Sequence, residues 1–416
     1  MSTKLQPVRG TKDLFASDYR LFLHVVNTAR NIAINYGFDD LATPIFEFAD
    51  VFRKTLGEET DVVTKEMYTF LDKGGEEITL RPEFTAGICR AFISNGYTQH
   101  LPLRLFSHGP LFRYERPQKG RQRQFHQINA EILGIKSPML DAEIIIMASQ
   151  ILEKLGISES IQLNLNSLGD KETRKIYRDS LTEYYRDHIN SLSEDSKVRL
   201  QKNPLRILDS KDENDKKINL NAPRISEFYN QESNDYYAAL KELLTLNAIK
   251  FTENPSLVRG LDYYEHTIFE FITDALGAQG TVIGGGRYDG LIETMGGPPT
   301  PAIGFAGGIE RLMELVDFKN FDANVLTVTI IAIGERAEKE SLAIATILRN
   351  NNIRVILPYQ NQVGKKFKYA DKINAKIAIV IGEEELEKNV AKIKNMLTGS
   401  EEIISIDNLL DKLGQY

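Results

Sequence analysis

The stretch that most constrains the fold of this 416-residue chain runs from Leu111 to Glu131 and reads LFRYERPQKGRQRQFHQINAE. Two segments with alternating side-chain types flank a polar, turn-like stretch, Pro117 to Gln124. Because successive side chains of a strand point to opposite faces, the pattern predicts a β-hairpin with one polar face. That face would carry the side chains of Arg113, Glu115, Phe125, Gln127, Asn129 and Glu131.

The loop of this predicted hairpin is basic and carries Arg116, Lys119, Arg121 and Arg123. Arginine grips phosphate in two-point contacts, and a carboxylate beside an aromatic ring suits the exocyclic amine and the face of a nucleobase. The alternative is a solvated hairpin with a basic tip, since charge runs usually lie on the surface.

A resemblance favours the first interpretation. The segment FRYERPQKGRQRQFHQ resembles motif 2 of class II aminoacyl-tRNA synthetases, in which a strand with Phe-Arg-x-Glu precedes a variable loop and a return strand bearing an aromatic residue. The version in this chain is similar to that of the histidyl-tRNA synthetases.

Composition sets wider bounds. The length allows two or three domains, and 42% hydrophobic with 26% charged residues is ordinary for a globular protein. The formal net charge of −7 argues against wholesale electrostatic binding of nucleic acid. Cys89 is the only cysteine, which excludes an intrachain disulfide and a cysteine zinc cluster. No signal core and no run of roughly 18 apolar residues is present, so we expect a cytoplasmic protein without a membrane partner.

The N-terminal part predicts a helix followed by a strand. Apolar residues recur at helical spacing from Asp18 to Tyr36, and Gly37 is a typical helix terminator. The next segment, FDDLATPIFEF, reads as a strand with Pro44 inside it, which suggests a strand at an edge. Together they resemble motif 1 of class II synthetases, so we expect a homodimer joined around residues 36–48.

Residues 68–71 and 77–80 predict a strand pair around a turn, and LRPEFTAGICRAFIS follows, with a helix expected from about Thr85. Glu83 and Thr85 near a helix start are good capping groups, worth about 1 kcal/mol. The segment also resembles the Arg-Pro-Glu-x-Thr-Ala stretch of the family, whose acidic residue and threonine bind the α-amino group of the amino acid. Many members carry Gly where this chain has Phe84.

After a predicted helix (141–155) and strand (161–166), the composition becomes charged, Tyr-rich and helix-forming from about residue 170 to 248. We interpret this region as a helical insertion on the core, and such insertions commonly carry recognition. The resemblance implies that it lies near the acceptor arm of tRNA.

Two later stretches are dense in polar residues. SLVRGLDYYEHTIFEFIT (256–273) contains Leu257 to Tyr264, which matches a segment specific to histidyl-tRNA synthetases, and Tyr263 to Ile272 alternates as a strand. GGGRYDG (284–290) follows another short predicted strand, and its glycines taken alone indicate a tight turn. The GxxxxGK[ST] phosphate loop is absent.

AIGFAGGIERLMELV (302–316) predicts a strand joined to a helix with Arg311 in its first turn. Glycines before a helix N-terminus leave N–H groups that can bind an anion, which Arg311 would reinforce. The segment resembles motif 3, whose arginine contacts the triphosphate.

The C-terminal part follows a linker-like stretch, 317–324, and alternates strands (325–333, 354–357, 377–381) with helices (337–350, 363–374). This alternation predicts a small α/β domain with parallel strands. It resembles the anticodon-binding domain of histidyl-tRNA synthetases.

The resemblance covers nearly the whole chain and implies an α+β fold. It would comprise a class II synthetase core at 1–324, an antiparallel sheet flanked by helices with the insertion, and an α/β anticodon-binding domain at 325–416. The implied activity is attachment of L-histidine to tRNA(His) through a histidyl-adenylate, with ATP and Mg²⁺.

The resemblance also implies roles for particular residues, with no protein ligand set for a metal. Arg113 and the catalytic Arg259 would neutralise the α-phosphate and the histidine carboxylate. The remaining ATP contacts would be Glu115 and Phe125 at adenine, and Arg121 and Arg311 at the outer phosphates. Histidine would be bound by Glu83, Thr85 and Gln127 at the α-amino group, by Glu131, Tyr264 and Tyr288 around the imidazole, and by Tyr263.

Two alternatives belong to other classes. A histidine-sensing regulatory subunit that partners an ATP phosphoribosyltransferase resembles this enzyme, but such relatives typically lose the catalytic arginines and the C-terminal domain. A tRNA- or RNA-binding module without catalysis would not need a complete histidine pocket. Histidine-dependent exchange of pyrophosphate into ATP separates these alternatives from the synthetase.

Overall fold

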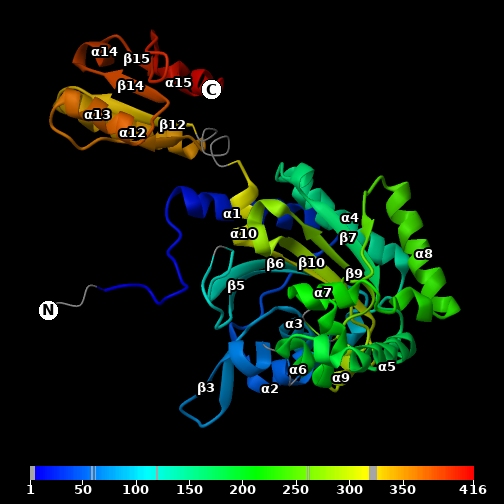
Figure 1. Ribbon diagram of the computed structural model, residues 1–416. Helices are drawn as coiled ribbons and strands as arrows, with labels where there is room; N and C mark the ends of the chain where they lie inside the picture. Colours follow the sequence, from blue (N-terminus) through cyan, green and yellow to red (C-terminus); the bar gives the residue numbers. More distant parts are fainter. Residues whose placement is uncertain are drawn as a thin grey trace. The chain divides into compact units, whose positions relative to one another are not determined.

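The computed structural model describes residues 5–57, 60, 62–118, 120–259, 261, 263–317 and 326–416. Internal contacts divide the chain into two compact units, Met1–Val316 and Asp317–Tyr416. Each unit has its own central sheet and its own hydrophobic core (Figure 1). The expected linker at 317–324 lies almost wholly outside the described residues.

The N-terminal unit is organised around a twisted eight-stranded sheet. In spatial order its strands are β1 (Asp39–Asp40), β5 (Leu103–Phe112), β6 (Gln124–Leu133), β11 (Ala302–Gly308), β10 (Thr281–Arg287), β9 (Glu265–Ile272), β7 (Gln162–Ser167) and β8 (Thr252–Glu253). The six inner strands are mutually antiparallel, and the two short edge strands pair in parallel. The predicted antiparallel core is therefore confirmed.

Helices cover one face of this sheet and bury its apolar side chains. They are α1 (Ser17–Asn35), α4 (Pro138–Lys154), α8 (Gln231–Leu246) and α10 (Ile309–Leu315), which lie along the sheet in Figure 1. On β6 the side chains of Ile128, Ala130 and Ile132 point into this core and are almost completely buried. The alternate side chains of β6 point to the other face of the sheet.

A small second sheet and two helices cover part of the other face of the central sheet. The strands β2 (Phe46–Phe48), β4 (Glu77–Leu80) and β3 (Tyr68–Leu71) form this second sheet, beside α2 (Ala49–Leu56) and α3 (Thr85–Ser94). The hairpin of β3 and β4 and the start of α3 agree with the sequence prediction.

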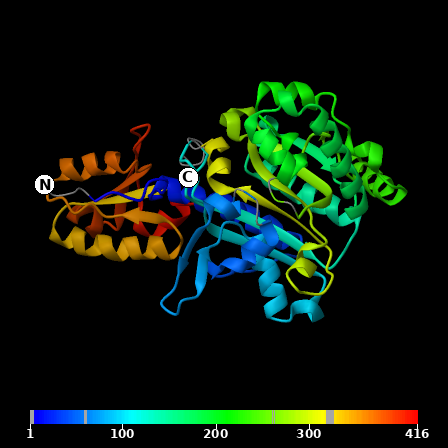
Figure 2. The same ribbon diagram turned by 60° about the horizontal axis from the view of Figure 1, so that its bottom comes forward.

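The predicted insertion is helical. It comprises α5 (Lys171–Asp187), α6 (Glu194–Lys202), α7 (Glu213–Asn219) and α8, and a short helix α9 (Leu291–Thr294) comes later. Figures 1 and 2 both show the green helices of the insertion gathered on one side of the N-terminal unit. Buried residues of α5 and α6, among them Tyr177, Leu181 and Leu200, form a second core with α3.

The strand expected at 38–48 was wrong as a single element. It is divided into β1 and β2, which belong to different sheets, with Pro44 between them. The physical reason lies in Arg81, whose buried guanidinium donates to the carbonyl oxygens of Thr43 (2.8 Å) and Pro44 (3.4 Å). These carbonyls are bound by a side chain instead of a neighbouring strand, and proline has no N–H to contribute.

Three further boundaries differ from the prediction. The first arm of the hairpin ends at Phe112, so Arg113 and Glu115 follow the strand instead of lying in it. The strand expected to begin at Tyr263 begins at Glu265. The glycines 284–286 lie inside β10 and not in a turn after a strand.

The C-terminal unit is a five-stranded sheet with helices, as the alternating pattern predicts. Its strands in spatial order are β13 (Arg354–Ile356), β12 (Thr327–Ala332), β14 (Ile377–Ile381), β15 (Val390–Asn395) and β16 (Glu401–Ser405). The first three are parallel, and β15 and β16 are antiparallel additions. Its helices are α12 (Glu335–Asn350), α13 (Val363–Lys372), α14 (Glu383–Glu387) and α15 (Leu409–Leu413).

A buried ion pair ties the central sheet to its helices. Arg287 on β10 bonds Asp141 on α4, and both side chains are 0% exposed. Asp141 also accepts from Thr267 Oγ1 (2.6 Å) and Tyr236 Oη (3.1 Å), while Arg287 donates to Asp289 (2.8 Å). Burial alone would lower the pKa of Arg287, but the Asp141 carboxylate outweighs it and raises that pKa.

We expect Arg287→Met to destabilise the N-terminal unit by about 3 to 5 kcal/mol, because Asp141 is left as an uncompensated buried charge. Removing both charges, in Arg287→Met with Asp141→Leu, should recover part of that loss. Denaturant unfolding followed by circular dichroism measures the change. The matched control is Arg53→Met at the partly exposed Arg53–Glu77 pair, which should cost about 1 kcal/mol or less. Equal losses in the two variants would contradict this account.

Candidate functional site

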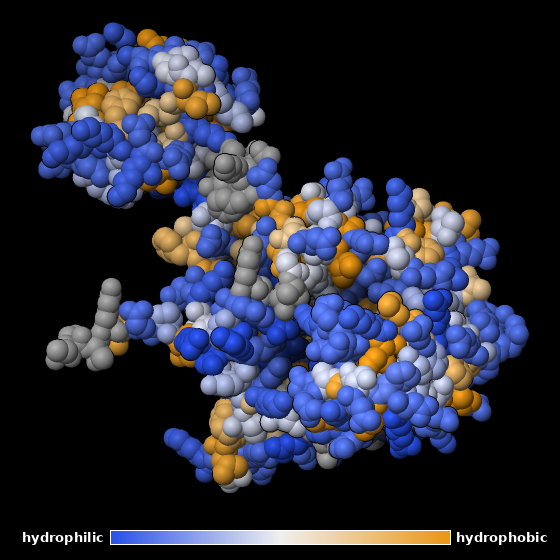
Figure 3. Space-filling model, in the orientation of Figure 1, coloured by the Kyte–Doolittle hydropathy of each residue, from blue (hydrophilic) through white to orange (hydrophobic). Residues whose placement is uncertain are grey.

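A cavity of about 600 Å³ opens over the face of the central sheet opposite to helices α1, α4, α8 and α10. The space-filling view of this side shows a mainly hydrophilic surface with a recess near the centre of the N-terminal unit (Figure 3). Every side chain to which the sequence assigned a role lines this one cavity. These are Glu83, Thr85, Arg113, Glu115, Arg121, Phe125, Gln127, Glu131, Arg259, Tyr263, Tyr264, Tyr288 and Arg311.

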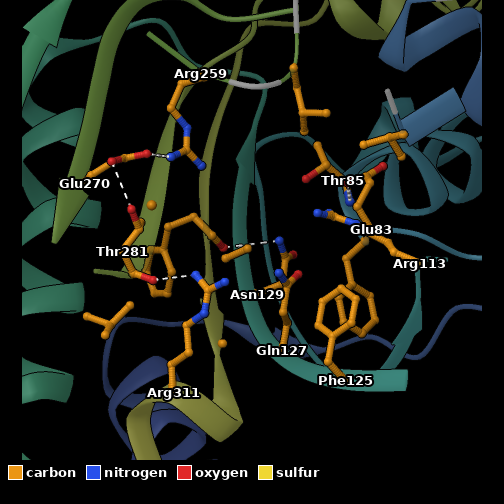
Figure 4. A pocket seen from close by; sticks show the side chains of 18 of the residues that line it. Glu83, Thr85, Arg113, Phe125, Gln127, Asn129, Arg259, Glu270, Thr281 and Arg311 are labelled. Carbon is orange, nitrogen blue, oxygen red and sulfur yellow. Dashed lines mark hydrogen bonds and ion pairs between the residues drawn. The ribbon is translucent and has the colours of Figure 1, made fainter. Parts of the chain in front are cut away.

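Strand β6 supplies the floor of the cavity. Phe125, Gln127, Asn129 and Glu131 all line it, while Ile128 and Ala130 between them enter the core. The side-by-side position of these four residues follows from the strand period of two. The predicted polar face of the hairpin is therefore present on its second arm (Figure 4).

Glu131 is fully buried at one end of the cavity and accepts three hydrogen bonds. Thr85 Oγ1 (2.6 Å) and Asn129 Nδ2 (3.0 Å) donate to one carboxylate oxygen, and Tyr288 Oη (2.5 Å) donates to the other. Gly304 lies directly opposite Glu131 on β11, and a Cβ at that glycine would collide with the carboxylate. Burial raises the pKa of Glu131 to about 7, although the three hydrogen bonds oppose the rise.

Glu83 combines a structural contact with its place in the cavity. Its two carboxylate oxygens accept from the backbone N–H groups of Thr85 and Ala86, each at 2.6 Å, at the start of α3. The capping interpretation considered from the sequence is thus correct for this carboxylate. Burial raises the pKa of Glu83, and the two backbone donors oppose the shift.

Aromatic side chains close the same end. The ring centroids of Tyr263 and Tyr264 are 4.6 Å apart, and those of Tyr263 and Tyr288 are 5.6 Å apart. Burial raises the pKa of Tyr264 and, more strongly, of Tyr263 and Tyr288. Their hydroxyls therefore stay protonated at neutral pH and can donate hydrogen bonds.

The middle of the cavity holds Arg113 and Phe125. Arg113 Nε donates to the carbonyl oxygen of Pro82 (2.9 Å), and its guanidinium carbon lies 5.4 Å from the centroid of the Phe125 ring. Nearby, Arg121 Nε lies 3.0 Å from a carboxylate oxygen of Glu115. Glu115, which was assigned to adenine, and Arg121, which was assigned to the outer phosphates, are therefore paired with each other in this structure.

Arg259 and Arg311 lie towards the other end, and the Arg259 guanidinium carbon is also 5.7 Å from the centroid of the Tyr264 ring. Arg259 forms an ion pair with Glu270, and Arg311 donates to the carbonyl oxygens of Thr281 (2.7 Å) and Gly120 (3.2 Å). Burial alone would lower the pKa of Arg259. The Glu270 carboxylate outweighs this effect, so the net shift of the pKa is upward. Burial, followed by the nearby Arg121 charge, lowers the pKa of Arg311.

Sequence reasoning missed some of the lining residues. Glu270 was not assigned, although the alternation of β9 was a signal that could have been followed to it. Arg199 and Arg206 of the insertion also line the cavity, and no local pattern in their sequence marks them. Lys119, Gly260 and Asp262, which belong to the predicted site segments, lie outside the described residues.

The remaining basic residues of the hairpin loop gather at a second, more open hollow. It is lined by Arg9, Tyr114, Glu115, Arg116, Pro117 and Arg123. The guanidinium of Arg123 lies 3.8 Å from the centroid of the Tyr114 ring. No cluster of three or more His, Cys, Asp or Glu side chains suited to a metal occurs within the described part of the chain. In the same residues, no helix has the length and apolar character needed to cross a membrane.

Known proteins match this chain along nearly its whole length. The family model for histidyl-tRNA synthetase matches residues 10–312, and that for the anticodon-binding domain matches residues 327–416. The histidine–tRNA ligase of Wolbachia pipientis wMel is 52% identical, covering 98% of this chain and 99% of the relative. That of Gluconobacter oxydans is 49% identical over 97% of both chains. Apo histidyl-tRNA synthetase from S. aureus matches with a TM-score of 0.81 and 36% identity, covering 99% of this chain and 100% of that one.

The raised pKa of Glu131 predicts a pH dependence of stability. Between the usual pKa of 4.5 and about 7, the unfolded state releases this proton while the folded state keeps it. The unfolded state then binds fewer protons, so the free energy of unfolding falls as the pH rises through this window.

We expect Glu131→Gln to remove this dependence. Relative to the parent, the variant should gain on the order of 3 kcal/mol of stability between pH 5 and pH 8. The loss of hydrogen bonds changes the stability of the variant equally at both pH values. The pH dependence of the stability difference between variant and parent therefore reports the titration of Glu131 alone. Denaturant unfolding of both proteins at the two pH values measures it. A difference that does not change with pH would show that Glu131 is ionised in the folded state throughout.

Proposed function

Because the chain belongs to the histidyl-tRNA synthetase family, we propose that it attaches L-histidine to tRNA(His) at the expense of ATP, through a histidyl-adenylate. The observation that carries the proposal is the division of the cavity into two ends. One end is a buried carboxylate with three tyrosines and a threonine, which suits a small polar ring with an amino group. The other end carries arginines, which suit phosphates.

In the first step, a carboxylate oxygen of histidine attacks the α-phosphorus of ATP. The bond from that phosphorus to the bridging oxygen of the leaving group breaks, giving histidyl-adenylate and pyrophosphate. Arg113 and Arg259 neutralise the α-phosphate and the histidine carboxylate, and Arg259 takes over part of the work that a metal would do. No protein nucleophile is needed, because positioning and charge neutralisation account for catalysis of this type.

The nucleotide lies along the hairpin. Phe125 stacks on adenine and Glu115 accepts from its exocyclic amine, which requires the Glu115–Arg121 pair to open. Arg121 is then available for the outer phosphates, together with Arg311. Mg²⁺ would enter as part of the MgATP substrate, because this ion is usually held by substrate phosphates and one or two carboxylates. Glu310 and Glu314 are carboxylates of the cavity lining on the same side as Arg311.

Histidine occupies the buried end. Glu83, Thr85 and Gln127 hold the α-amino group, and Glu131, Tyr264 and Tyr288 surround the imidazole, with Tyr263 beside them. A site that hydrogen-bonds a polar ring rejects apolar analogues strongly, because its own buried polar groups would be left unpaired. The hydrogen bond from Tyr288 to Glu131 supports this assignment, since it orients the carboxylate.

In the second step, a hydroxyl of the terminal ribose of the tRNA attacks the activated carbonyl, and AMP leaves. We assign the core to residues 1–324, with the insertion at about 170–248, and the anticodon-binding domain to 325–416. The match of residues 327–416 to the anticodon-binding model supports the last assignment. The proposal includes a homodimer joined around residues 36–48 and a cytoplasmic location, where tRNA and ATP are available.

We expect Arg259→His to lower histidine-dependent exchange of pyrophosphate into ATP by about a hundredfold or more, because a preorganised charge at the reacting phosphate is lost. Its circular dichroism spectrum should match that of the parent. Arg186→His, at an exposed position on α5 outside the cavity, is the matched control and should keep full exchange. If Arg259→His retains exchange within a few-fold of the parent, Arg259 is not a transition-state group.

Truncation after Asn324 should preserve histidine-dependent exchange while charging of tRNA falls steeply. The reason is that every residue assigned to ATP and histidine precedes Asp317, whereas joining two weak tRNA contacts in one chain raises overall affinity. Exchange and charging assays measure the two effects, and light scattering of full and truncated chains at micromolar concentration reports whether each is a dimer. A truncated dimer that charges tRNA as well as the full chain would remove the anticodon-binding assignment. A monomeric mass for active full-length protein would contradict the proposed homodimer.

A further inference from the structure

Glu270 connects the two arginines at the phosphate end of the cavity. One of its carboxylate oxygens pairs with Arg259, and the other accepts from Thr281 Oγ1 at 3.1 Å. The backbone carbonyl of the same Thr281 accepts from Arg311 Nη1 at 2.7 Å. Figure 4 shows these four residues as one row of contacts along the cavity wall, with the Arg259 guanidinium pointing into the cavity. The row therefore links Arg259 to Arg311 through one carboxylate and one threonine.

The two strands that carry this row are built to admit the guanidinium. Glu270 on β9 lies directly opposite Gly284 on β10 in the antiparallel register. A Cβ at Gly284 would meet Arg259 Nη1 at 2.6 Å and Nη2 at 2.9 Å. The guanidinium therefore lies in the space that any other residue at position 284 would fill, directly beside the carboxylate that binds it.

The contact is largely shielded from water. The side chains of Arg259 and Glu270 are 19% and 18% exposed. An ion pair at such a site is stronger than one in bulk water and holds a long side chain that otherwise has many rotamers. Thr281 fixes the second carboxylate oxygen, so Glu270 is itself held in place when it orients Arg259.

We propose that Glu270 is a positioning residue, which holds the Arg259 guanidinium at the α-phosphate and, through Thr281, at a fixed separation from Arg311. This rests on the proposed function, which gives the two arginines their phosphates. Such preorganisation lowers the barrier because the charge need not be moved into place during the reaction. In this proposal Glu270 acts through Arg259 and not through a contact of its own with the substrates.

The test is histidine-dependent exchange of pyrophosphate into ATP by the full-length chain. Glu270→Gln keeps the size of the side chain and removes the charge that holds Arg259. We expect kcat to fall by about tenfold or more, with the KM for histidine changed by less than about threefold. Gly284→Ala, which places a methyl group where the guanidinium lies, should give the same pattern. Glu265→Gln is the matched control on the same strand, outside the cavity lining, and should behave like the parent.

A double-mutant cycle separates positioning from a structural role. In the Arg259→His background, Glu270→Gln should lower kcat by less than about twofold, because the group through which it acts is already gone. Additive losses would overturn the proposal, and so would a kcat of Glu270→Gln within twofold of the parent. A kcat above that of the parent would also overturn it, since the carboxylate would then compete with substrate for Arg259. A parent chain without any histidine-dependent exchange would instead overturn the proposed function itself.

Discussion

The alternation of side chains across the central antiparallel sheet is the constraint on which both the core and the cavity depend. On β6 one set of side chains, including Ile128 and Ile132, is buried on the face that packs against α1 and α10. The other set, including Gln127 and Glu131, lines the cavity. A shift of register by one residue would exchange the two sets and abolish core and site together. The stability of the core therefore also fixes the position of the cavity floor.

Buried charged side chains of the N-terminal unit are held by several kinds of partner. Arg81 is bound by backbone carbonyl oxygens, Glu83 by backbone N–H groups, and Arg287 by the Asp141 carboxylate. Glu131 is held by three neutral side chains, and burial raises its pKa to about 7. A carboxyl group that is close to titration at neutral pH can donate or accept a hydrogen bond, which suits a ligand ring that does the same.

Glycine has a specific steric use in this sheet. At positions 284 and 304 a side chain would enter the space taken by Arg259 and by Glu131, respectively. The two glycines lie on neighbouring strands, one beside the Arg259 guanidinium and one beside the buried Glu131 carboxylate. Glycine usually weakens a strand, but at these two positions it leaves room for Arg259 and Glu131 to pack against the strand backbone.

The sequence by itself determined the order of the elements, the antiparallel hairpin, the helical insertion, the α/β pattern of the C-terminal unit and, through its resemblance to a known family, thirteen of the residues that line the cavity. These follow from local periodicity and from motifs whose residues are close in the chain. Only the tertiary structure decided that residues 38–48 serve two sheets, because the guanidinium that binds Thr43 and Pro44 comes from Arg81, far along the chain. It likewise decided that the glycines at 284–286 are strand and not turn, and that Glu270 holds Arg259. Such pairings join residues from different strands and loops, and their partners are chosen by sheet register and burial, which local sequence patterns do not encode.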